Sequence, residues 1–365
     1  EQALQRGLHR RGVEGLAAPG PIHVLTFTER GIYRAGETVY ATALARDRAA
    51  EQALTDASYT GQILMFTFPQ IGIYGVDEKN FQSTGVRALA CVAREITAVP
   101  EANGPLGRYF AEHGLLGISG VDTRALTIGT REQGALRSGL VCGDDATPEH
   151  AVELARAVPP LTEQDLIPAV STPAFYAVPG RGGRRVAVLD LGIKKNMMVS
   201  LLRRGAEVGV FPHDTPPDVI EAWKPDLLFV TNGPGDPVRA TAPVRTVSAL
   251  IGRLPIYGIC MGNQLAALAL GGSTYKMQFG HRGSNQPVRY RDGRIFITTQ
   301  NHGFVVDAWS LPEGADASYV NLNDGTAEGF DVPDLEIHCV QFHPEAHGGP
   351  RDSEVHFFDS MLGGR

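Results

Sequence analysis

Residues 255–270 read PIYGICMGNQLAALAL and lead from a short apolar run, through Cys260, into a helical pattern. The glycines on either side of Cys260 remove side chains that would clash in a sharp strand-to-helix turn. At such a turn the thiol would project into solvent at the carboxyl edge of a sheet. The partial positive charge of the helix N-terminus would favour its thiolate form. The stretch therefore indicates a nucleophile elbow with sulfur as the nucleophile; a buried cysteine near glycines by chance is the alternative.

Strand and helix patterns alternate on both sides of this stretch. Such alternation predicts an α/β fold with a mostly parallel sheet that helices cover on both faces. The expected strands are 184–192, 206–212, 226–230 and 255–260, and the expected helices are 195–204, 216–224, 242–250 and 264–270. The later runs RIFITT (294–299) and IHCVQFHP (337–344) extend this sheet or add an antiparallel edge.

The length of 365 residues suggests two domains. Residues 169–185 are rich in Pro, Gly and Arg and have no periodicity, which is typical of a linker. We therefore expect a polar extension at 1–21, a first domain at 22–168 and a second at 186–365. In the first domain we expect strands at 22–27 and 61–69 and helices at 105–113, 122–133 and 147–157, with Asp122 and Gly134 as caps.

Charge and composition exclude several classes of function. The net charge is −7 without a long basic run, so we expect no binding to nucleic acid. No apolar run approaches the roughly 18 residues of a membrane span, and the first residues lack the apolar core of a secretory signal. The four cysteines are scattered without a CxxC pair. We therefore expect no disulfide framework, no metal site and a cytoplasmic location.

A base for the thiol is found in QFHPE, residues 341–345. His343 and Glu345 are two positions apart, so their side chains lie on the same side of an extended chain. A cysteine nucleophile needs a base and a group that orients the base, and this pair supplies both. A surface or core histidine without a catalytic role is the alternative.

Two glycine-containing loops follow further strands. In TNGPGDP (231–237), Gly233 and Gly235 allow backbone N–H groups to approach a ligand. Together with the amide of Met261 they would hold an oxyanion beside the thiol; a simple turn is the alternative. QNHGF (300–304) is a second polar loop of this kind and indicates little by itself.

Together, the motifs GICMGNQ, NGPGDP, QNHGF and FHPEA resemble the class I glutamine amidotransferase domain. LDLGIKKNMMVSLLRRGAEVGVFP and FGHRGSNQPV are similar, more narrowly, to the small, glutamine-hydrolysing subunit of carbamoyl-phosphate synthetase. LTDASYTGQILMFTFPQIGIYGV and GISGVDTRALT resemble the N-terminal domain of that subunit. The resemblance runs from about residue 22 to the end and implies a flavodoxin-like fold for the second domain.

The resemblance also implies site residues and partners. Cys260 would be the nucleophile, His343 the general acid and base, and Glu345 its orienting carboxylate. The implied contacts to L-glutamine are Ser58, Gly233, Gly235, Met261, Gln264, Asn301, Gly303 and Phe304. Ammonia would pass through a tunnel to a large subunit. That subunit uses ATP, magnesium and bicarbonate to make carbamoyl phosphate for arginine and pyrimidine synthesis. The subunits would form a higher oligomer of heterodimers. This chain, which lacks a P-loop, would need no cofactor.

The chain departs from the family pattern in three places. Asn263 replaces a histidine, Ala57 replaces a proline, and residues 40–57 are Ala- and Arg-rich and helix-prone. Two other functions are open at this point. One is an amidotransferase subunit of another synthase, which the N-terminal domain argues against. The other is a catalytically impaired regulatory subunit, which the intact Cys260, His343 and Glu345 argue against.

Overall fold

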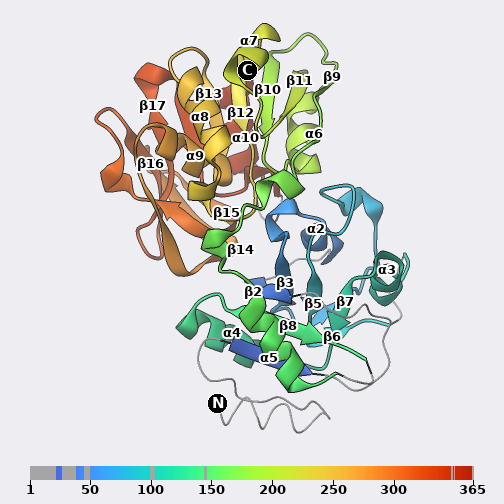
Figure 1. The fold of residues 1–365 in the computed structure, drawn as a ribbon. Coiled ribbons are helices and arrows are strands. Elements are labelled where there is room, and N and C mark those ends of the chain that lie inside the picture. Colours follow the sequence, from blue (N-terminus) through green and yellow to red (C-terminus); the bar gives the residue numbers. More distant parts are fainter. Residues whose placement is uncertain are drawn as a thin grey trace. The chain divides into compact units, whose positions relative to one another are not determined.

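A computed structural model describes residues 22–26, 38–44, 50–98, 103–143, 146–346, 348 and 350–363. The extension expected at 1–21 lies outside the described residues. The chain divides into two compact units, residues 1–160 and 161–365 (Figure 1). The division precedes the expected linker at 169–185, because Tyr176–Val178 form strand β9. This strand pairs antiparallel with β11 (Glu207–Pro212) and so belongs to the second unit.

The first unit contains a six-stranded sheet in the order β1-β8-β2-β3-β5-β7. Its strands are β1 (Ile22–Thr26), β2 (Thr38–Leu44), β3 (Gln62–Phe66), β5 (Ala90–Val92), β7 (Leu116–Ile118) and β8 (Arg137–Val141). A separate pair is formed by β4 (Gln70–Ile71) and β6 (Glu95–Ile96). The helices are α2 (Ala50–Leu54), α3 (Leu106–His113), α4 (Thr123–Gln133) and α5 (Pro148–Ala157).

The helix signals of the first unit are confirmed, and the described residues of its helix-prone segment are part strand and part helix. The carboxylate of Asp122 accepts the N–H of Ala125 at the start of α4, and Gly134 follows its last residue. Among the described residues of the Ala- and Arg-rich segment 40–57, those up to Leu44 belong to β2, Ala50–Leu54 form α2, and a 3-10 turn begins at Ala57. β2 pairs with both β3 and β8, so sheet pairing overrides the local helix propensity in the part of the segment up to Leu44.

The second unit is built on a ten-stranded sheet whose centre is parallel (Figure 1). The parallel strands are β10 (Arg185–Asp190), β11, β12 (Leu227–Val230), β13 (Ile256–Ile259) and β18 (Ile337–Val340). Their order is β11-β10-β12-β13-β18, which is the 2-1-3-4-5 order of the flavodoxin-like fold. The expected fold is therefore confirmed, and the expected strand at 337–344 extends the parallel part of the sheet.

An antiparallel extension continues the sheet beyond β18. It consists of β17 (Ala327–Val332), β16 (Asp316–Asn321), β14 (Thr274–Tyr290) and β15 (Ile295–Val306), in that order. The long β14 and β15 form an antiparallel pair whose register is interrupted between Lys276 and His281 and again between Gly283 and Gln286. Such irregularities re-aim side chains locally.

Helices cover both faces of the parallel strands, as the sequence predicts. They are α6 (Lys195–Arg203), α7 (Pro217–Ala222), α8 (Thr241–Leu250), α9 (Met261–Ala269) and α10 (Asp352–Leu362). Successive residues of β10 alternate between two cores: Val186 packs in the core that contains α6 and α10, and Ala187 in the core that contains α7, α8 and α9. The carboxyl ends of the parallel strands meet at one edge, where ligands bind in such folds. Within the described residues, no helix has the length and apolarity needed to cross a membrane.

Candidate active site

Cys260 lies at a strained turn between β13 and α9. Its backbone has φ 56° and ψ −101°, a conformation that costs free energy for a residue with a side chain. The turn is tight because the start of α9 packs closely against β13, the strand that precedes it, and against β12. A Cβ at Gly258 would lie 2.7 Å from the carbonyl carbon of Gly262, and a Cβ at Gly262 would overlap the carbonyl oxygen of Val230. The predicted elbow is confirmed, but the Cys260 residue is only 4% exposed and so is not on an open surface.

His343 and Glu345 lie at the carboxyl end of β18 and are both buried. The Nδ1 atom of His343 is 2.9 Å from Oε1 of Glu345. The two residues do not lie along an extended chain, because a short 3-10 turn begins at Pro344. The backbone N–H of His343 donates to the carbonyl of Thr299 on β15, at 2.8 Å, and this fixes where the imidazole leaves the backbone.

Lys194 completes this buried group from the carboxyl end of β10. Its Nζ atom is 3.1 Å from Oε1 of Glu345 and 3.1 Å from Nδ1 of His343. A carboxylate is acceptor-only, whereas an ammonium and a protonated Nδ1 are donors, so Glu345 accepts from both neighbours. Lys194 lies within LDLGIKKN, but no role was predicted for it from the sequence. Its position directly after a buried strand, at the edge expected to carry the site, was the available signal.

The charges of this buried group raise the pKa of His343 and lower the pKa of Glu345. Burial would lower the pKa of His343 and Lys194 lowers it further, but Glu345 and Cys260 outweigh both, so the pKa of His343 is raised. Burial would raise the pKa of Glu345, but Lys194 and His343 hold it well below its usual range. His343 is therefore suited to take and hold a proton, and Glu345 stays ionised.

The thiol of Cys260 interacts electrostatically with the imidazole of His343. Cys260 is among the groups that raise the pKa of His343. The Nε2 atom of His343 is buried and has no hydrogen-bond partner of good geometry among the described residues. The sulfur of Cys260 is also 3.9 Å from the backbone carbonyl of Asn301 on β15. Such loose geometry is common in unliganded active sites and tightens when substrate binds.

A network of amide side chains ties the elbow helix to the strands around it. The Nε2 atom of Gln264 donates to the carbonyl of Phe304, at 2.8 Å, and to Oε1 of Gln341, at 3.1 Å. Asn263, which replaces the family's histidine, donates to the same oxygen at 3.1 Å. Both amide hydrogens of Gln264 are thus used inside the protein, so only its oxygen remains for a ligand. No role was predicted for Gln341 from the sequence.

The remaining predicted glutamine contacts lie in three places. Gly233 and Gly235 follow β12, and a Cβ at Gly233 would overlap the carbonyl oxygen of Leu191. Gly303 lies on β15 between Asn301 and Phe304, whose backbone carbonyls contact Cys260 and Gln264. Ser58 lies in the first unit, within a 3-10 turn at Ala57–Tyr59, and its contact to glutamine stays a prediction. The second unit therefore brings the elbow, the His343–Glu345 pair and β15 together at one edge.

A flavodoxin-like sheet with a cysteine elbow and a buried histidine–carboxylate pair defines the class I glutamine amidotransferases. The family model described as glutamine amidotransferase class-I matches residues 187–361, and that of the carbamoyl-phosphate synthase small chain, CPSase domain, matches residues 23–140.

Several carbamoyl phosphate synthase small chains are similar over most of their length. That of Methanosarcina mazei is 44% identical over 340 residues, which cover 90% of this chain and 91% of the relative. That of Methanocaldococcus jannaschii is 42% identical over 333 residues, with 90% and 91% covered. That of Clostridium perfringens is 39% identical over 331 residues, with 90% and 92% covered. The chain belongs to the carbamoyl-phosphate synthase small-chain family, and it is a glutamine-hydrolysing enzyme subunit.

Proposed function

We propose that this chain hydrolyses L-glutamine through Cys260, His343 and Glu345 and delivers the ammonia to a large synthetase subunit. The partner would make carbamoyl phosphate from bicarbonate and ATP, and this chain would need no cofactor of its own. The observation that carries the proposal is the buried group of Lys194, Glu345 and His343 beside a cysteine elbow. The match of the first unit to the small-chain domain supports the choice of partner.

In the first step, His343 takes the thiol proton and the sulfur of Cys260 bonds to the side-chain carbonyl carbon of glutamine. The carbonyl electrons move to oxygen and form an oxyanion. The N–H of Met261 begins α9 and has no acceptor inside the helix, so it is suited to bind this oxyanion. Gly233, on the neighbouring loop, is the second proposed source of a backbone N–H.

In the second step, the oxyanion collapses and the carbon–nitrogen bond breaks. Nε2 of His343 gives its proton to the departing nitrogen, which leaves as ammonia. Water then adds to the γ-glutamyl thioester while His343 takes a proton from it, and the carbon–sulfur bond breaks. The thiol is restored and glutamate leaves, so glutamine and water become glutamate and ammonia.

Glu345 and Lys194 act through His343 in this scheme. Oε1 of Glu345 accepts the Nδ1 proton of His343, which leaves Nε2 as the nitrogen that exchanges protons. Lys194 holds the carboxylate in place and ionised. The two residues therefore position the base and stabilise its protonated form.

The direct test is to purify the chain in complex with the large subunit of a carbamoyl phosphate synthase. Glutamate release is measured with and without ATP and bicarbonate. We expect these ligands to stimulate glutamate release. We also expect Cys260→Ser to abolish glutamine use while the complex still makes carbamoyl phosphate from added ammonium chloride.

Each other outcome identifies an alternative. Glutamine hydrolysis that is independent of the large subunit and its substrates would point to another synthase as partner. A complex that forms but never hydrolyses glutamine would indicate a regulatory subunit. Glutamine use that survives Cys260→Ser would show that the nucleophile is misassigned.

A further inference from the structure

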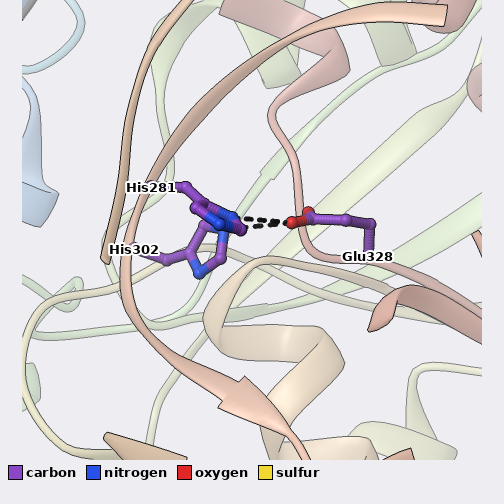
Figure 2. Close-up of side chains that lie close together, drawn as sticks. All are labelled: His281, His302 and Glu328. Carbon is purple, nitrogen blue, oxygen red and sulfur yellow. Dashed lines mark hydrogen bonds and ion pairs between the residues drawn. The ribbon is translucent and has the colours of Figure 1, made fainter. Parts of the chain in front are cut away.

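A second cluster of buried ionisable side chains lies in the antiparallel extension of the sheet. His281 on β14 is directly opposite His302 on β15, and Glu328 is on β17. The three residues are 6%, 4% and 0% exposed. Figure 2 shows both imidazoles approaching the carboxylate of Glu328. One nitrogen of each ring and a carboxylate oxygen all lie within 4.8 Å of one another.

The hydrogen bonds of His302 leave a lone pair that points into the cluster. Its Nδ1 atom is 2.9 Å from the carbonyl oxygen of Phe304, which can only accept, so Nδ1 carries the proton. With the proton on Nδ1, the Nε2 atom of the neutral ring carries a lone pair and can only accept. Yet Nε2 faces Oε1 of Gln300 at 3.3 Å and Oε1 of Glu328 at 3.7 Å. Both of these atoms are acceptors as well.

The orientation of Gln300 is fixed by its other neighbours. The hydroxyl of Thr298 donates to the carbonyl of Gln286 at 3.0 Å. The hydroxyl oxygen of Thr298 can therefore accept a hydrogen bond, and Nε2 of Gln300 donates to it at 3.1 Å. This arrangement turns Oε1 of Gln300 toward His302. Nε2 of His302 therefore faces two acceptor atoms, and a cation or an additional proton between them would satisfy all three.

Both ring nitrogens of His281 lie within hydrogen-bond distance of a carboxylate. Its Nε2 atom is 2.8 Å from the carboxylate of Asp324, and its Nδ1 atom is 2.9 Å from Oε1 of Glu328. The amide nitrogen of Asn321 is 3.4 Å from the same Nδ1 and 3.3 Å from the same Oε1. The second oxygen of Glu328 is buried without a hydrogen-bond partner among the described residues.

We propose that His281, His302 and Glu328 bind one divalent transition-metal ion of the Zn²⁺ class, with the amide oxygen of Gln300 facing the fourth position. Zn²⁺ binds imidazole nitrogen and carboxylate oxygen at about 2.0–2.2 Å, so donors around a tetrahedral ion lie roughly 3.4 Å apart. The separations of 2.9 and 3.7 Å from Oε1 of Glu328 to the two imidazole nitrogens bracket this value.

The outer contacts of both rings fit a metal site. Histidines that bind metals usually donate their other N–H to a carboxylate or a backbone carbonyl. His281 has Asp324 in this place and His302 has the carbonyl of Phe304. On binding, the ion displaces the proton that His281 and Glu328 share. No metal site was expected from the spacing of the cysteines, and this spacing carries no information about residues on these three strands.

The ion would act as a cross-link between β14, β15 and β17. His302 lies between Asn301 and Gly303, two of the residues expected to contact glutamine. The site would therefore stiffen the strand that borders the elbow. The proposal does not depend on the chemistry of Cys260, and its readouts are metal content and thermal stability.

The test uses the full chain, without a histidine tag, in a Cys260→Ser background that removes the catalytic thiol as a competing ligand. The chain is stripped with a chelator, titrated with ZnSO4, desalted and analysed for metal. We expect about one Zn²⁺ per chain and a melting temperature higher by about 5 °C at 100 times Kd. Substituting Co²⁺ should give the visible absorption of a tetrahedral nitrogen and oxygen site.

Variants separate the cluster from incidental binding. Glu328→Gln should weaken Zn²⁺ binding at least 100-fold, and Asp324→Asn, at a half-exposed position, about 10–100-fold. His338→Gln is the matched control, because His338 pairs with Asp331 at 3.0 Å but has no third ligand among the residues that the structure describes, and it should bind as tightly as the background. Failure to bind micromolar Zn²⁺, equal binding by Glu328→Gln, or no visible Co²⁺ band would each overturn the proposal. The Co²⁺ spectrum decides the matter even if Glu328→Gln does not fold.

Discussion

Gly262→Ala tests whether the elbow depends on the close approach of α9 to β12. The new Cβ would overlap the carbonyl oxygen of Val230 and would lie 2.8 Å from its carbonyl carbon. Ordinary carbon–carbon contacts are about 3.5–4.0 Å, so the helix must move away by about 1 Å. Because the obstacle is backbone, no side-chain rotation can relieve it.

Two quantities follow from this displacement. Overpacking of this kind costs about 2–3 kcal/mol of unfolding free energy, which lowers the melting temperature of a unit of this size by about 4–12 °C. Cys260 lies two residues away, at the turn that starts α9, so it moves with the helix. A displacement of about 1 Å at a reacting group costs on the order of 100-fold in rate.

The assay is urea denaturation together with the initial rate of glutamate release by the complex. Gly107→Ala is the matched control, because Gly107 is also inside a helix and a Cβ there meets nothing within 4 Å. We expect this control to gain about 0.5–1 kcal/mol and to keep full activity. Wild-type stability and rate in Gly262→Ala would refute the packing argument.

Three further predictions concern the charges around His343. His343→Ala should lower kcat/KM for glutamine by about 10²–10⁴-fold, and Glu345→Ala by less, because orienting a base matters less than being one; the reverse ranking would contradict the assigned roles. Lys194→Met should move the alkaline limb of the pH–rate profile to higher pH, because Lys194 lowers the pKa of His343, and an unmoved limb would count against this coupling. The depressed pKa of Glu345 means that the unfolded chain takes up a proton first as the pH falls. Wild type should therefore lose its stability advantage over Glu345→Gln progressively as the pH falls from about 5.5 through about 2, as measured by urea denaturation, and a constant difference would disprove the linkage.

The sequence predicts the second unit well because its signals are local. Each parallel strand is a short buried run that ends in a loop, and the glycines around Cys260 indicate the turn from their spacing alone. The strand at 337–340 was harder to place, because its pairing with β13 joins residues about 80 positions apart and leaves no local trace. The residues of segment 40–57 up to Leu44 were misleading for the same reason, since pairing with β3 and β8 decides their conformation.

The sequence predicts the proposed catalytic residues of the site but not all of the residues that surround them. Cys260, His343 and Glu345 are motif residues and can be found by spacing. Lys194 was not recognised, because its contact to Glu345 spans 151 positions and is made only when β10 and β18 end at the same edge. Likewise, nothing in the sequence brings His281 and His302 to Glu328, because three separate strands must first align.

The central claim is that the sulfur of Cys260 carries a γ-glutamyl group during turnover. The complex is mixed with glutamine, quenched in acid, digested with pepsin and analysed by mass spectrometry. The account predicts that the peptide containing Cys260 gains the mass of one γ-glutamyl group and that hydroxylamine removes it. Continued glutamate release with no adduct on this peptide, or with the adduct on another residue, would contradict it.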